Sequence, residues 1–189
     1  LPTAIHLSRR LRRHMRKVHG HFEQVFISPQ GEKAEADDRG LAAVWLDTLD
    51  SDALHQRLAQ AGFKDPPATE ALLRGLRAGS AYDGLSAQGR ERLDRLMPLL
   101  LGAAGLTGDP QTTLARLIKL IEAIVRRSVY IALLVENPMA LSQLVKLFSA
   151  SDWIAHWISQ HPVLLDELID PATLYAPAPR ADLEAEIQS

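Results

Sequence analysis

The helix-period spacing of its apolar residues constrains the fold of this chain more than any other feature. Apolar side chains recur at steps of three and four along most of the sequence, whereas the alternation of β-branched residues that is typical of strands is missing. Prolines and glycines interrupt this pattern at intervals, and such residues end or begin helices. We therefore predict an all-α fold, an irregular helical bundle with one long central helix and short, proline-punctuated helices toward the C-terminus.

The long central helix is expected after residue 109. Asp109 supplies a side chain that suits an N-cap, and Pro110 stands at the first helical position, which proline favours. The apolar stripe then continues to about Glu136, where the Asn137-Pro138 pair stops it. The spacing thus predicts one helix over this interval, roughly 40 Å long at about 1.5 Å per residue.

Composition divides the chain into four parts. Residues 1–27 are predicted to form a basic amphipathic helix, and the polar, acidic and turn-rich residues 28–40 are predicted to form a linker. The helical domain is expected over 41–175, and residues 176–189 follow it. No fixed-length repeat relates the helices, so the pattern favours a compact irregular bundle over a solenoid.

The absence of cysteine and the balance of charge exclude several classes of function. Without cysteine the chain has no disulfide, no thiolate nucleophile and no cysteine-ligated metal site, and a cytoplasmic location is the expectation. The net charge of -2 gives no global reason to expect nucleic acid or a membrane as a partner. The longest apolar run, Leu96 to Leu106, is shorter than the roughly 18 residues of a membrane span. The basic stretch Arg9 to Lys17 alone leaves a phosphate-binding or lipid-binding alternative open.

The stretch from Ser149 to Asp170 gathers the residue types from which metal and acid/base sites are built. His156 follows Asp152 by one helical turn, but no third ligand is in register with them, and no two histidines are four residues apart. Asp166 and Glu167 are neighbours, and adjacent helical side chains point about 100° apart, so they do not face one substrate. The pattern therefore favours a structural role for this stretch.

Helical spacing instead predicts a packing face within the same stretch. Trp153 lies one turn before Trp157, and Ile154 lies one turn before Ile158. We expect Trp153 to be a core residue whose truncation to alanine costs about 3 to 5 kcal/mol. The polar line on the opposite side is expected to be Asp152, His156 and Gln160.

Signatures of phosphate binding and of serine hydrolases are also incomplete. The glycine-rich run GAAGLTG, residues 102–108, lacks the ending of a P-loop and no strand precedes it, so we predict a connection between helices. Ser86 lies in GLSAQG, whose second glycine is displaced from the nucleophile-elbow pattern, and it is better placed as an N-cap. We therefore predict no catalytic, cofactor-binding or metal-binding residue in this chain.

Two longer stretches resemble a known family. IEAIVRRSVYIALLVENP, from Ile121 to Pro138, and LVKLFSASDWIAHWISQHPVLLDELIDP, from Leu144 to Pro171, are similar to the middle of the bifunctional glutamine synthetase adenylyltransferase/adenylyl-removing enzymes. HGHFEQVF, residues 19–26, resembles the end of the first catalytic half of that family. The matching positions include Glu122, Arg126, Arg127, Tyr130, Asn137, Pro138, Leu147, Ser149, Ser151, Trp153, Ile154, His161, Pro162, Leu164, Leu165, Asp166, Glu167, Leu168 and Asp170.

The resemblance implies an enzyme with two nucleotidyltransferase halves joined by helices. One half transfers AMP from ATP to a tyrosine of glutamine synthetase, and the other half removes it by phosphorolysis. The implied cofactors of the parent enzyme are ATP and Mg²⁺, and the implied partners are glutamine synthetase, the PII signalling protein, glutamine as effector and the flanking catalytic halves. Residues 1–27 would then end the preceding half, and residues 176–189 would lead into the second.

Neither active site of that family is expected within this chain. Each half of such an enzyme uses a Gly-Ser turn followed about a dozen residues later by Asp-x-Asp, because paired carboxylates hold Mg²⁺ against phosphates. Here Gly79-Ser80 is followed by no such pair, and Asp50-Ser51-Asp52 is preceded by no Gly-Ser. The resemblance thus implies a helical central fragment with a structural and regulatory role. The alternatives are an unrelated helical adaptor that docks on other proteins, or a small self-contained enzyme.

Overall fold

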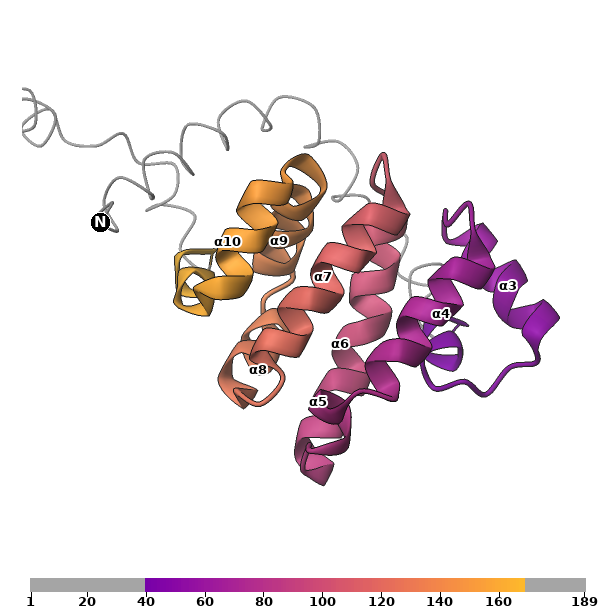
Figure 1. The fold of residues 1–189 in the computed structure, drawn as a ribbon, viewed down its shortest axis with the longest axis horizontal. Helices are drawn as coiled ribbons and strands as arrows, with labels where there is room; N and C mark the ends of the chain where they lie inside the picture. Colours follow the sequence, from indigo (N-terminus) through magenta and orange to yellow (C-terminus); the bar gives the residue numbers. More distant parts are fainter. Residues whose placement is uncertain (1–39, 169–189) are drawn as a thin grey trace, which may run out of the picture.

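The computed structural model describes residues 40–168, apart from the side chains of Ser128 and of residues 166–168 (Figure 1). Within this part the chain is helical and contains no strand, which confirms the all-α prediction. A short helical segment at 40–45 comes first. The elements that follow it are α3 (Ser51–Gln60), α4 (Pro66–Arg77), α5 (Ser80–Asp83), α6 (Ala87–Gly105), α7 (Pro110–Ile124), α8 (Ser128–Glu136), α9 (Pro138–Ala150), α10 (Asp152–Gln160) and the 3₁₀ helix η2 (Pro162–Leu168).

Side-chain caps determine where most of these helices begin. At the start of α3, α4, α6, α7 and α10 an oxygen of the preceding side chain accepts a backbone N–H from the first turn, which satisfies a donor that the helix itself cannot pair. The predicted capping roles of Ser86 and Asp109 are confirmed. The two hydrogen bonds to Asp109 from Thr112, from its side chain and its backbone, lower the pKa of that carboxyl.

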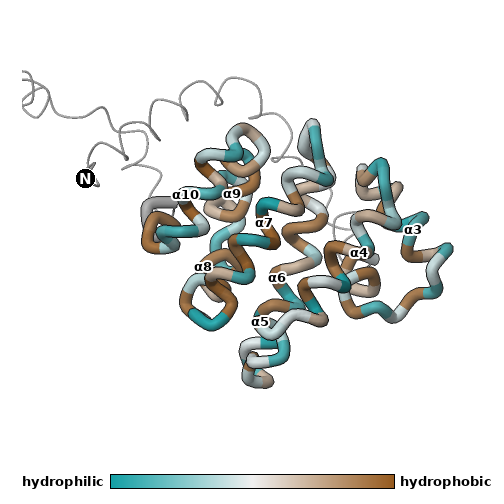
Figure 2. The backbone as a smooth tube through the Cα atoms, viewed as in Figure 1, coloured by the Kyte–Doolittle hydropathy of each residue, from teal (hydrophilic) through white to brown (hydrophobic). Residues whose placement is uncertain are grey.

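The core is built around α7, which lies between α6 on one side and α9 with α10 on the other (Figure 1). Leu114, Leu120 and Ile124 of α7 are fully buried, and α4, α8 and η2 contact the same helix. Figure 2 shows the apolar residues gathered where these helices face one another. The prediction of a central helix beginning at Pro110 is therefore confirmed.

The length predicted for that helix is wrong. Instead of running to Glu136, it ends at Ile124, and α8 begins at Ser128 after a turn. Arg127 has a non-helical backbone at the break, and its N–H donates to Ile124 O at 2.7 Å in place of the regular helical bond. The longest helix among the described residues is α6, with 19 residues.

The break has a physical reason in the apolar residues of this region. They surround the helix axis instead of forming one stripe, so a straight helix would leave part of them in water. By turning at 125–127, the chain folds α8 against α6 and α9, and Ile131 and Leu134 become buried there. The breadth of this apolar surface thus favours two shorter helices over one straight helix.

The proline-punctuated arrangement of the C-terminal helices is confirmed as far as the structure describes it. Asn137 ends α8 and precedes Pro138, the first residue of α9. His161 caps the end of α10, and Pro162 begins η2. The third such pair, Asp170-Pro171, lies outside the described residues. So do the predicted basic helix of 1–27, the linker up to residue 39 and the lead-in of 176–189.

Within residues 40–168, no single helix has both the length and the hydropathy that crossing a membrane requires. The segments Val129–Glu136 and Pro138–Ala150 have the required length and hydropathy only when taken together, and the two helices are bent by 102° relative to each other.

Two glycines bring the turn after α3 into direct contact with the end of α6. Gly62 has φ +102°, a conformation that glycine adopts without strain, and its backbone lies against that of Gly105. A Cβ on Gly105 would overlap the carbonyl oxygen of Ala61, and a Cβ on Gly62 would overlap that of Gly105. The predicted connection at 102–108 starts later than expected, since α6 continues to Gly105. Both glycines are packing residues, because only backbone atoms fit between the two segments.

We predict that Gly105→Ala lowers the free energy of unfolding by about 1 to 3 kcal/mol, since the added methyl group forces two backbones apart. Gly75→Ala is the matched control, because Gly75 is an exposed helical glycine with open space around it. That variant should gain roughly 0.5 to 1 kcal/mol. Urea unfolding followed by circular dichroism measures both. A Gly105→Ala variant as stable as the parent chain would show that the contact is not tight.

Candidate functional site

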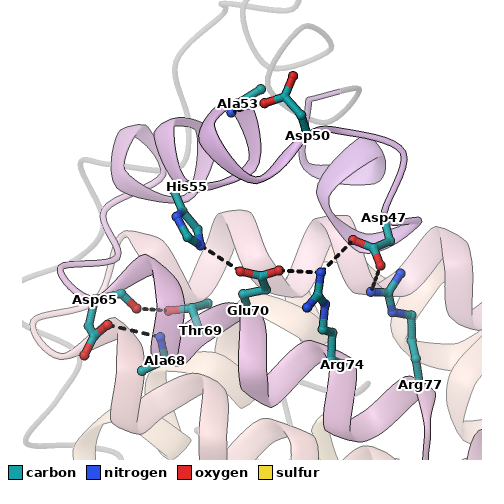
Figure 3. A network of polar contacts seen from close by, with 10 residues as sticks. All are labelled: Asp47, Asp50, Ala53, His55, Asp65, Ala68, Thr69, Glu70, Arg74 and Arg77. Atoms are coloured by element: carbon teal, nitrogen blue, oxygen red, sulfur yellow. Dashed lines mark hydrogen bonds and ion pairs between the residues drawn. The ribbon is translucent and has the colours of Figure 1, made fainter.

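A row of charged side chains connects the first described turn with α3 and α4 (Figure 3). His55 Nε2 lies 2.7 Å from a carboxylate oxygen of Glu70, and the other oxygen of Glu70 lies 2.7 Å from the Arg74 guanidinium. Arg77 pairs with Asp47 at 2.9 Å, and Arg74 approaches the same carboxylate at 3.9 Å. The row therefore alternates between basic and acidic side chains and crosses three segments of the chain.

Local structure explains how these groups come to face one another. Glu70, Arg74 and Arg77 are spaced by four and three residues, so they occupy one side of α4. Asp47 follows the helical segment 40–45 and has φ 58°, a left-handed conformation that aspartate tolerates better than most residues. The chain reverses there, which places the Asp47 carboxylate beside α4 (Figure 3).

Beneath the row, the buried Trp45 anchors the same region. Its indole N–H donates to Asp94 at 2.7 Å, and its carbonyl oxygen accepts from Arg77 at 2.9 Å. The Tyr82 ring meets the Trp45 ring edge to face, with centroids 6.0 Å apart. The indole N–H and the carbonyl of Trp45 thus have partners on two different helices, α6 and α4.

Tyr82 is the titratable group that this centre perturbs. Burial raises the pKa of its phenol, and the nearby Asp94 carboxylate raises that pKa further, against the opposing effect of Arg90 and Arg77. The Arg90 guanidinium lies 5.4 Å from the centroid of the Tyr82 ring. A phenol, a carboxylate and two guanidinium groups could in principle transfer protons or hold an anion. Here they are engaged with one another, so the arrangement is suited to holding α4, α5 and α6 together.

Sequence reasoning missed this network almost entirely. The spacing of Glu70 and Arg74, one helical turn apart, was the one readable signal for an ion pair. Asp94 and Trp45 are 49 residues apart, and nothing in the local pattern brings them together.

The groups considered as metal or acid/base candidates do not converge in the described part of the chain. No cluster of three or more metal-ligating side chains occurs among those residues. Asp152 pairs with the Nε of Arg116 at 3.2 Å, and His156 is exposed. Asp50 is committed to capping α3. The side chains of Asp166 and Glu167 lie outside the described set.

The prediction that Trp153 belongs to the core is wrong. Trp153 is 43% exposed, whereas Ile154, Ala155 and Ile158 are the buried residues of α10. The apolar arc of this helix is wider than the face that fits against α7 and α9, and the aliphatic side of the arc occupies that face. The expected polar line is confirmed in part, since Asp152, His156 and Gln160 are exposed.

The two tryptophans instead form a stack along the helix. The rings of Trp153 and Trp157 are 5.8 Å apart at an interplanar angle of 21°. The Trp157 ring in turn stacks on His161, at 4.5 Å and 17°. Trp157 is partly buried. The stretch singled out as a possible active site therefore carries an aromatic surface.

Comparison with known proteins relates the chain to one group of enzymes. It is 53% identical, over 95% of its length, to a bifunctional glutamine synthetase adenylyltransferase/adenylyl-removing enzyme of Thioalkalivibrio sulfidiphilus, of which it covers 19%. The identity is 47% with the enzyme of that name from Nitrosococcus oceani, over 87% of this chain and 17% of the relative. It is 42% with that of Chromobacterium violaceum, over 91% and 19%. The chain is homologous to a segment of these enzymes.

The homology confirms the resemblance seen in the sequence and shows how much of the relatives the chain covers. The chain spans about a fifth of the length of the adenylyltransferase/adenylyl-removing enzymes that it matches. No family model matches the chain. The matched length includes residues beyond 40–168, so the relationship does not rest on the described helices alone.

We predict that the stability contribution of Tyr82 falls at alkaline pH. Because its folded pKa lies above the ordinary value of 10.0, the folded state retains the phenolic proton longer than the unfolded state. The contribution is fully present below pH 10 and is lost as the pH rises through the raised pKa. Urea unfolding of the parent chain and of Tyr82→Phe between pH 8 and about 11 tests this. The stability of the parent relative to the variant should decline with pH, and a constant difference would contradict the prediction.

We also predict that Ile158→Ala lowers the free energy of unfolding more than Trp153→Ala does. Ile158 is fully buried, and removing such a side chain costs about 2 to 5 kcal/mol. Trp153 contributes mainly its stacking on Trp157, worth about 0.5 to 1.5 kcal/mol. Chemical denaturation of both variants gives the comparison. Equal losses of stability in the two variants would contradict the prediction and would indicate that Trp153 packs as a core residue.

Proposed function

We propose that this chain is the helical region that joins the two nucleotidyltransferase halves of a bifunctional glutamine synthetase adenylyltransferase/adenylyl-removing enzyme, and that its role is structural and regulatory. The observation that carries the proposal is the identity of 53% over nearly the whole chain with an enzyme of that name, of which the chain is a small part. In this sequence no Gly-Ser pair is followed by Asp-x-Asp at the spacing that the family uses, which supports a location outside both active sites.

The parent enzyme would act in nitrogen regulation in the cytoplasm. It would transfer AMP from ATP to a tyrosine of glutamine synthetase and remove it by phosphorolysis, with Mg²⁺ held at the catalytic halves. Glutamine and the PII signalling protein would decide which of the two reactions runs. No residue of this chain is proposed to contact ATP, Mg²⁺ or the tyrosine.

The physical basis for a coupling role is the single core that the described helices share. α7 contacts α4 and α6 as well as α9, α10 and η2, so no part of this bundle shifts far without repacking the rest. Such an element transmits a signal when it has two arrangements that both ends favour differently. A helical region packed on both catalytic halves would meet this condition.

Binding and activity measurements test the proposal on the chain itself. The purified chain, supplied with ATP, Mg²⁺ and glutamine synthetase, should transfer no AMP, since it lacks the paired carboxylates that hold the metal. Transfer that is lost on replacing an acid of this chain would identify it as an enzyme in its own right.

The regulatory part of the proposal has a separate test. Glutamine, and PII in its free and uridylylated forms, are titrated by calorimetry into the chain and into each catalytic half. We expect the chain to bind one of these effectors. Binding to the catalytic halves alone would reduce this region to a spacer. A gene in which no Gly-Ser…Asp-x-Asp module flanks this segment would favour the unrelated adaptor.

A further inference from the structure

A groove lies between the end of α6 and α9, and we call it the α6–α9 groove. Its apolar surface comes from Ala103, Leu106 and Val145, and Thr107 and Ser149 are part of its walls. The space inside measures about 300 Å³ and opens to solvent. Leu106 is 56% exposed, so the described helices leave the largest apolar side chain of the groove uncovered.

The walls of this groove suit apolar side chains better than a polar small molecule. The Thr107 hydroxyl donates to the carbonyl of Ala104 at 2.7 Å, and the Ser149 hydroxyl donates to that of Lys146 at 2.9 Å. Sites for small molecules orient their ligands with a few convergent polar groups and measure roughly 300 to 1,000 Å³. The groove is at the lower limit of that size, and these two hydroxyl donors are already engaged.

The chain enters the described bundle beside the groove. Leu41 packs on Gly102 of α6, since a Cβ on that glycine would lie 3.5 Å from the Leu41 Cδ1. The next residue of α6, Ala103, already lines the groove. The segment that precedes Gly40 is therefore attached next to this surface.

The C-terminal segment leaves the bundle from a different place. α10 begins at Asp152, three residues after Ser149, and its nine residues extend about 13 Å before η2 begins. η2 then packs against α7, α9 and α10, and residues 169–189 follow it. The point of attachment thus favours the N-terminal segment as the occupant of the groove.

The sequence before Gly40 supplies apolar side chains of the required kind. Residues 28–39 contain no large apolar side chain, and the first ones upstream are Phe22, Val25, Phe26 and Ile27. Phe22, Val25 and Phe26 are spaced by three and four residues, which places them on one side of a helical turn. The twelve residues between Ile27 and Gly40 span up to about 40 Å when extended, whereas α6 is about 28 Å long. The phenylalanines can thus reach any part of the groove.

Charge selects the same part of the N-terminal segment. Lys146 is one of the residues that line the groove, so a second cluster of cations is disfavoured there. Residues 9–17 contain six arginine and lysine residues, whereas residues 18–27 contain none and include Glu23. The stretch nearest to the linker is therefore the part that the groove accepts.

From the point of attachment, the apolar spacing and the charge, we infer that residues 22–27 of the same chain dock in the α6–α9 groove. Phe22 and Phe26 cover Leu106 and fill the space beside Ala103. Docking closes the linker of 28–39 into a loop and fixes where the basic residues 9–17 leave the bundle. The inference does not depend on the proposed function.

Paramagnetic broadening of backbone amide signals tests the docking in the full chain. The chain has no cysteine, so Ala150→Cys accepts a single nitroxide label beside the groove without changing a residue that lines it. Gln88→Cys is the matched control, because Gln88 is exposed at the opposite end of α6. We expect the amide signals of residues 22–27 to lose most of their height with the label at position 150 and to keep it with the label at position 88.

Paired variants show whether the two phenylalanines hold the segment. Replacing Phe22 and Phe26 by serine in the chain labelled at position 150 should restore the broadened signals. Replacing Leu7 and Leu11 by serine makes a similar change farther from the linker and should leave the broadening in place. Broadening that survives the loss of both phenylalanines would overturn the inference.

The same spectra distinguish other occupants of the groove. Broadening of residues 169–189, without broadening of residues 22–27, would assign the groove to the C-terminal segment and contradict the inference. Broadening in an isotope-labelled chain mixed with a separate spin-labelled chain would assign it to a second copy, with the same consequence. Full signal height for residues 22–27 with the label at position 150 would show that they do not dock.

Discussion

Burial of α7 on nearly every side is the constraint on which the rest of the structure depends. Its fifteen residues include eight buried ones, and their side chains point toward helices on both sides of it. Even its buried Thr113 is satisfied, since the hydroxyl donates to the carbonyl of Asp109 at 2.8 Å. Because α7 supplies the centre, α4 and α10 need only one apolar side, and their other sides remain free for charge or for aromatic surface.

The bundle is held together differently at its two sides. Around α7, α9 and α10 the helices are held together by apolar packing, with Leu144, Phe148 and Ile158 fully buried. Arg116 adds a polar tie there, since it donates to the carbonyl of Phe148 at 2.7 Å and pairs with Asp152. The side formed by α3, α4 and the segment 40–45 also has an apolar interior, in which Leu58, Leu73 and Trp45 are buried, and it adds a row of ion pairs. Exposed ion pairs contribute little stability individually, so that side too depends on its buried residues.

Local signals in the sequence were enough to predict where several helices begin, because caps and proline starts act within a few residues of where they stand. Ser86, Asp109 and Pro138 all lie where those rules place them. Signals that depend on a partner far along the chain were not readable. The break at Arg127 arises because α6 and α9 offer surfaces for α8, and the exposure of Trp153 arises because α7 accepts Ile158 instead. Spacing shows which residues share a helix side, but the neighbouring helices decide which side is buried.

The paired glycines fix the closest approach between two segments of the bundle. Elsewhere in the core, side chains separate the backbones, and a change of rotamer can absorb a shift of a few tenths of an ångström. Between Gly62 and Gly105 only peptide atoms meet, so the two segments cannot approach more closely. The distance between the turn after α3 and the end of α6 is therefore set by peptide atoms, and no change of rotamer can adjust it.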